Sequence, residues 1–174
     1  GYAACAVATC VRTIARDMEG GQVATVGNIN LHPNLINVIA ASASMTVDLR
    51  NTDEALLQRA ETSLAAFLVT LARDEGVTIT SRTLARFEPV VFDPAVVQRI
   101  EAIAQRLGLS HRRMTSGAGH DAQMLARICR SAMIFVPSIK GISHNPAENT
   151  LPADLTAGGN VLLHTMLELA EQEE

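Results

Sequence analysis

The chain has 174 residues, of which 48% are hydrophobic and 18% charged, enough apolar material for one medium domain or two small ones. Its formal net charge is −4, aromatic residues make up 3%, and Lys and Arg do not cluster, so no nucleic-acid partner is expected. No apolar run reaches the roughly 18 residues of a membrane span, so no membrane partner is expected either.

The cysteine spacing predicts a cellular compartment for the protein, and the first residues predict how the chain begins. The three cysteines, Cys5, Cys10 and Cys129, lack C-x-x-C spacing, which favours reduced thiols in a cytoplasmic protein. Apolar residues recur at helical spacing from Ala4 to Met18, with no N-cap before them and no initiator Met. The chain is therefore expected to be a fragment that begins with a helix.

Two strands are predicted next. Residues 22–34 read as a strand that runs into a turn at His32-Pro33-Asn34. Residues 37–50 alternate with period two, so the apolar and polar side chains face opposite ways. Arg50 then falls on the polar, open face of its strand.

A helix and a further strand complete the first half. A helix is predicted over 51–76, with Asn51 or Thr52 as its cap and Gly76 at its end. Residues 77–88 alternate again, as a strand does. The order α-β-β-α-β is one strand short of a β-α-β-β-α-β sandwich.

The pattern changes at residues 89–98, where Asp93 and Pro94 begin a helix. Short elements of α/β type follow: a strand near 111–116, a short helix, a buried strand over 132–137 and a final helix. The fold class expected is α/β, with a domain at 1–89 and another at 90–174.

Two histidines lie in glycine-containing loops, "SGAGHDA" and "GISHNPAE", each after a predicted strand, where ligands of α/β sheets bind. His120 is a candidate donor to developing negative charge, or a ligand, and His144 is a candidate metal ligand. A lone loop histidine is more often exposed or capping. A zinc site needs three or four ligands, and the available set of His120, Asp121, His144 and Glu148 contains no close pair to anchor the metal. A Ser-His-Asp triad is also disfavoured, because the Gly-x-Ser-x-Gly turn of such sites is missing around the serine of "GISHN".

The motifs "PNLINVI", "DLR", "SGAGHDA" and "GISHNPAE", in this order, resemble the M20-type metallohydrolases. They are most similar to the branch of N-carbamoyl-L-amino acid hydrolases, β-ureidopropionases and allantoate amidohydrolases, over nearly the whole chain. The resemblance implies a catalytic domain with two divalent metal ions, zinc or manganese, and an inserted β-α-β-β-α-β lid that makes a homodimer. Residues 1–89 would be the lid or dimerisation domain without its first strand, and 90–174 the C-terminal part of the α/β catalytic domain.

The same resemblance implies roles for single residues. His144 matches a metal ligand, His120 an active-site histidine, and Gly119 offers its backbone N–H to the substrate. Asn37 and Arg50 match lid residues that bind the substrate's carboxylate in the partner subunit's site. Because a straight strand would separate these two by about 40 Å, a shared site requires a bend between them, for example within 40–44.

The implied activity is metal-assisted hydrolysis of the C–N bond of N-carbamoyl amino acids or allantoate. The remaining ligands would lie upstream, so this chain alone is expected to be inactive and to hold no metal tightly. One alternative is a non-catalytic dimerisation or binding module of the same family, which a full-length gene lacking the upstream ligands would indicate. A second, an aminopeptidase of the same superfamily, is disfavoured by "GAGHDA" and "DLR".

Overall fold

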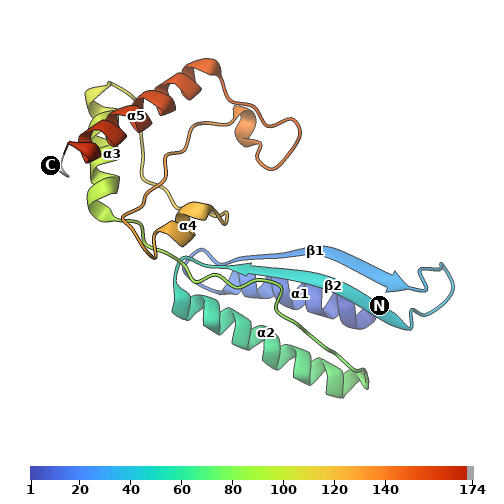
Figure 1. The fold of residues 1–174 in the computed structure, drawn as a ribbon. Coiled ribbons are helices and arrows are strands. Elements are labelled where there is room, and N and C mark those ends of the chain that lie inside the picture. The colour runs from blue at the N-terminus through green and yellow to red at the C-terminus, as the bar shows by residue number, and fades with distance from the viewer. Residues whose placement is uncertain (172–174) are drawn as a thin grey trace. The chain divides into compact units, whose positions relative to one another are not determined.

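A computed structural model describes residues 1–171, which form two compact units divided between residues 89 and 90 (Figure 1). The first unit contains α1 (Tyr2–Asp17), β1 (Val23–His32), β2 (Ser42–Arg50) and α2 (Glu54–Glu75). The second contains α3 (Pro94–Arg106), α4 (Asp121–Leu125), the 3-10 turn η1 (Ile139–Gly141) and α5 (Pro152–Ala170). No helix in this described stretch is long and apolar enough to cross a membrane. Whether the two units act as a lid and as part of a catalytic domain stays a prediction.

The first unit is an antiparallel hairpin with two helices on one face. Strands β1 and β2 pair from Val23 opposite Arg50 to His32 opposite Ser42, and α1 and α2 pack together below them (Figure 1). The core lies between the helices and the sheet and is built on Val7, Val11 and Leu71. The predicted first helix is confirmed, and the apolar side chains of its inner face include the almost fully buried Val11.

A β-bulge at Gly27 sets which side chains of β1 face the helices. The register pairs Val26 with Val47 before the bulge and Ile29 with Met45 after it. Because side chains alternate along a strand, the extra residue shifts the inward set from even to odd positions. Ile29 therefore shares a face with Met45 and Val47, whereas an unbroken strand would turn Asn28 to that side.

The N-cap of helix α2 is neither of the two predicted residues, Asn51 and Thr52, but the residue that follows them. Asp53 is the N-cap, and its carboxylate accepts a hydrogen bond from the Leu56 N–H at 3.0 Å. Asn51 instead accepts from the Asp53 N–H at 3.0 Å, which orders the turn before the helix. Gly76 ends α2 in the left-handed region at φ 62°, as predicted.

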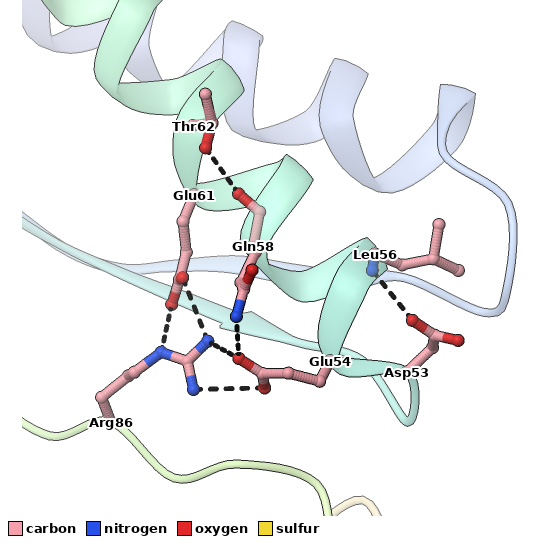
Figure 2. A network of polar contacts seen from close by, with 7 residues as sticks. All are labelled: Asp53, Glu54, Leu56, Gln58, Glu61, Thr62 and Arg86. Atoms are coloured by element: carbon pink, nitrogen blue, oxygen red, sulfur yellow. Dashed lines mark hydrogen bonds and ion pairs between the residues drawn. The ribbon is translucent and has the colours of Figure 1, made fainter.

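The predicted strand over 77–88 is wrong, since the structure leaves this segment without strand structure. Side-chain contacts, rather than a main-chain ladder, hold the segment 77–88 in place. Arg86 contacts Glu54 of α2 at 2.6 Å and Glu61 at 3.0 Å, and Gln58 donates to Glu54 at 2.7 Å (Figure 2). A strand needs a partner for its main-chain ladder. The alternation of apolar and polar residues in 77–88 reflects other contacts instead: Ile79 packs against the core, and Arg86 makes the polar contacts with α2.

The second unit packs α3 against α5. Asp93 caps α3 by accepting from the N–H groups of Ala95 and Val96, and Pro94 follows as predicted. Ile103 is fully buried against Val161.

The strands predicted over 111–116 and 132–137 are wrong, because the structure assigns neither segment a strand. The apolar run 132–137 does contribute to the core: Ile134 packs on the Ile103 cluster, and Val136 lies against Gly158 of α5. Without a neighbouring strand to exchange hydrogen bonds, apolar character alone does not make a ladder. Over the described residues the fold is therefore a mixed α and β structure with one two-stranded sheet, which lies in the first unit, and the α/β sheet expected in the second unit is not formed.

Helical spacing predicts that Leu155, Leu162, Met166 and Leu169 form the inward face of the final helix, but the structure of α5 differs from this prediction. Val161 and Thr165 are buried, whereas Leu155, Leu162 and Met166 are exposed. The helix is apolar on most sides, so spacing alone did not identify the side that packs.

Candidate functional site

Arg50 lies at the end of β2, on the face of the hairpin opposite α1 and α2. Asp48, two residues earlier on the same face, accepts from Arg50 Nε at 2.9 Å and from Nη2 at 2.6 Å. About half of each side chain is exposed. The hydrogen bonds from Arg50 hold the pKa of Asp48 below its ordinary value, and Asp48 raises the pKa of Arg50 in return.

The buried side-chain amide of Gln22 holds the backbone of Arg50 through a hydrogen bond. Gln22 is 6% exposed, and its Nε2 donates to the carbonyl oxygens of Val23 at 2.9 Å and Arg50 at 3.1 Å. Its Oε1 accepts from Asn51 Nδ2 at 3.0 Å. These bonds satisfy the buried amide and tie the start of β1 to the end of β2.

Asn37 does not lie beside Arg50. It is exposed in the loop that joins the strands, whereas Arg50 ends β2 opposite the start of β1 (Figure 1). Ser42 to Arg50 is continuous strand, roughly 26 Å at 3.3 Å per residue. The expected bend is absent from this strand, because the register irregularity falls in β1 between Val26 and Asn28. The structure thus places the two predicted carboxylate-binding residues at opposite ends of the hairpin.

His120 is the N-cap of α4, and its Nδ1 accepts from the Ala122 N–H at 3.0 Å. A ring nitrogen that accepts from a backbone N–H carries no proton, so in the neutral ring the proton is on Nε2. The side chain is exposed, and a Cβ added at Gly119 would meet no atom of the chain within 4 Å. His120 therefore presents an N–H donor beside an open backbone loop.

His144 lies in a tight turn with a left-handed backbone, φ 56°. Its backbone N–H donates to Glu148 Oε2 at 2.8 Å, and the Glu148 N–H donates to the Asn145 carbonyl at 2.9 Å. The loop is closed by a hydrogen bond from the Ile139 N–H to the Asn149 carbonyl at 2.8 Å. The imidazole is exposed while the backbone beneath it is held by these bonds.

These side chains do not make a metal centre by themselves. Within residues 1–171, no group of three or more His, Cys, Asp or Glu side chains is arranged to hold a metal ion. Glu148 already accepts the His144 N–H, and His120 Nδ1 already accepts the Ala122 N–H. The residues present offer single donors and do not fit a two-metal site.

Sequence reasoning missed the supports of Arg50. The period-two spacing that placed Arg50 on the open face places Asp48 there too, so that pair carried a readable signal. Gln22 carried none, because a glutamine next to two glycines reads as a turn residue.

The family model for peptidase family M20/M25/M40 matches residues 6–168, so the chain belongs to this family. It is 36% identical over 171 residues to an N-carbamoyl-L-amino-acid amidohydrolase of Rhizobium meliloti, covering 98% of this chain and 41% of the relative. It is 36% identical over 159 residues to an allantoate amidohydrolase of Escherichia coli K12, covering 91% of this chain and 39% of the relative.

A crystal structure of an amidase of the hydantoinase/carbamoylase family from Burkholderia vietnamiensis is also similar. Its TM-score is 0.89 at 41% identity, covering 96% of this chain and 40% of that one. The chain thus spans about 40% of the length of the proteins that it matches. The family resemblance read from the motifs is confirmed.

Proposed function

We propose that this chain is part of a metal-dependent amidohydrolase that cleaves the C–N bond of N-carbamoyl amino acids or allantoate. The observation that carries the proposal is the family match over residues 6–168, together with relatives that are amidohydrolases of these two classes. Both substrate classes carry a carboxylate and a ureido carbonyl. A site for either substrate needs a cation to bind the carboxylate and a hydrogen-bond donor for the oxygen of the ureido carbonyl.

Arg50 is proposed to bind the substrate carboxylate. A guanidinium presents a planar fork that matches a carboxylate, and this one lies half exposed on the open face of a regular strand. His120 is proposed to donate from Nε2 to the carbonyl oxygen as negative charge develops on it, with the backbone N–H of Gly119 beside it.

Asn37 and Arg50 are proposed to serve two different copies of the site. The strand between them is several times longer than an N-carbamoyl amino acid, so one substrate does not span both. In a homodimer formed through the first unit, the hairpin of each subunit would contribute Arg50, at one end, to one site and Asn37, at the other end, to the second site. This arrangement replaces the expectation that both residues bind the same carboxylate.

His144 is proposed as one ligand of a divalent metal ion, zinc or manganese, and the rest of the ligand set would come from residues outside this chain. A bound metal would polarise the carbonyl and activate water. The isolated chain is proposed to be inactive, since no group of its described residues is arranged to hold a metal ion.

The test is an activity assay on the protein expressed from its complete gene. After loading with zinc or manganese, release of ammonia from allantoate and of free amino acids from N-carbamoyl-L-amino acids is measured, with the 174-residue chain in parallel. We expect turnover of at least one substrate by the complete protein alone. No turnover of either by a folded, metal-loaded complete protein would favour the non-catalytic binding module, and turnover by the 174-residue chain would disprove its inactivity.

A further inference from the structure

Neighbouring residues hold both the side chain and the backbone of Arg50, which sets it apart from Arg16 and Arg73, each of which also pairs with an aspartate. Asp48 engages the guanidinium through both Nε and Nη2, and buried Gln22 binds the carbonyl oxygen of the same residue. Arg16 and Arg73 also pair with a neighbouring aspartate, but each sits in the last turn of a helix beside Asp17 or Asp74. At Arg50 alone among these three, a buried side chain fixes the backbone.

The pair with Asp48 adds little to folding stability on its own. Exposed ion pairs contribute little to folding stability, because water screens the charges and two long side chains lose freedom. What the pair does change is the freedom of the guanidinium. An arginine side chain that is ordered before a ligand arrives loses less entropy when it binds.

We propose that Asp48 is a positioning residue that holds the Arg50 guanidinium, on a backbone fixed by Gln22, in the orientation that receives the substrate carboxylate. This inference rests on the proposed function, in which Arg50 binds that carboxylate. Asp48 does not touch the substrate; it acts through Arg50. The charged fork is thereby preorganised by an aspartate two residues away on the same face of β2.

The two effects of Asp48 on substrate binding have opposite signs, which makes the proposal testable. As a negative charge next to the binding cation, Asp48 repels an anionic substrate, so its removal by charge alone would lower KM. As a positioning group it lowers the entropy lost on binding, so its removal raises KM. Ordering a long side chain costs about 0.5–1.5 kcal/mol, which converts to roughly a two- to twelve-fold change in affinity.

The experiment compares Asp48→Asn with Asp74→Asn in the protein expressed from its complete gene. Both substitutions remove one carboxylate that pairs with an arginine, but Asp74 pairs with Arg73 at the end of α2. KM and kcat are measured for allantoate or an N-carbamoyl-L-amino acid, whichever the protein hydrolyses. The double variant Asp48→Asn/Arg50→Lys and the single Arg50→Lys complete a cycle.

We expect Asp48→Asn to raise KM about three- to tenfold with kcat within about twofold, and Asp74→Asn to change neither. Because Asp48 acts through Arg50, the double variant should be no worse than Arg50→Lys. An unchanged or lower KM for Asp48→Asn, while Arg50→Lys raises KM, would overturn the positioning role alone. An unchanged KM for Arg50→Lys would overturn the carboxylate role of Arg50, and the positioning role with it.

Discussion

Two adjacent glycines in α5 should respond in opposite directions to the same substitution. Gly158 and Gly159 both lie inside the helix, where alanine in place of glycine reduces the freedom of the unfolded chain and stabilises by about 0.5–1 kcal/mol. A Cβ on Gly159 would meet no atom within 4 Å. A Cβ on Gly158 would overlap Val136 Cγ1.

At Gly158, the overlap of the added Cβ with Val136 decides whether alanine stabilises or destabilises the fold. Val136 is β-branched and stiff at χ1, so relief requires the 132–137 segment to move away from α5. Overpacking of this kind costs about 1–3 kcal/mol, which exceeds the gain in helix propensity. Gly158→Ala should therefore destabilise by up to about 2 kcal/mol, and Gly159→Ala should stabilise by about 0.5–1 kcal/mol.

The assay is urea unfolding followed by far-ultraviolet circular dichroism, with hydrogen exchange of α5 peptides as a local readout. Gly159→Ala is the matched control, since it changes the same helix by the same atoms. Equal or greater stability of Gly158→Ala relative to Gly159→Ala would refute the close packing of α5 on Val136.

Three further predictions concern the proposed site and the segment after α2. Arg50→Lys should raise KM at least about tenfold, because an ammonium lacks the bidentate fork; steady-state kinetics of the complete protein check this. His144→Ala should lower the metal content after loading and desalting, as measured by elemental analysis, and full occupancy would show that His144 is not a ligand. The hydrogen bonds from Arg86 hold the pKa of Glu54 below its ordinary value, so the carboxylate stabilises the fold above its unfolded pKa and loses this effect as pH falls through the lowered pKa. The melting temperature of Arg86→Met should therefore lie below that of the wild type near pH 7 and approach it near pH 3, and a gap that persists in acid would argue against the ion pair.

Local signals in the sequence were sufficient where a single residue decides the structure. The left-handed end of α2 at Gly76 and the start of α3 at Asp93-Pro94 follow from the chemistry of those residues alone. The motif-based family assignment succeeded for a similar reason, because each motif is a short run of specific residue types.

Strands failed where pairing was required. Residues 77–88 and 132–137 have the alternating or apolar patterns of strands, but a ladder depends on a neighbour that a pattern cannot reveal. For the site, the open face of Arg50 was predictable from period-two spacing. The separation of Asn37 from Arg50 depends on where the hairpin loop ends and β2 begins, at Ser42, and no glycine or proline between the two residues marks that point.

Gly27, at the bulge of β1, has no partner on β2, so the pairing of the two strands does not depend on it. A Cβ at Gly27 would make only ordinary contact, at 3.5 Å from Thr46 Oγ1, so the position tolerates a side chain. Losing the residue would not turn the later side chains of β1 over, because Val26 and Asn28 already pair with the consecutive residues Val47 and Thr46. Asn28 would stay turned away from the helices and Ile29 toward them. A gene encoding this hairpin therefore tolerates both a changed codon and a lost codon at position 27, whereas loss of a codon for a paired residue of β1 would move every later inward-facing side chain to the other face.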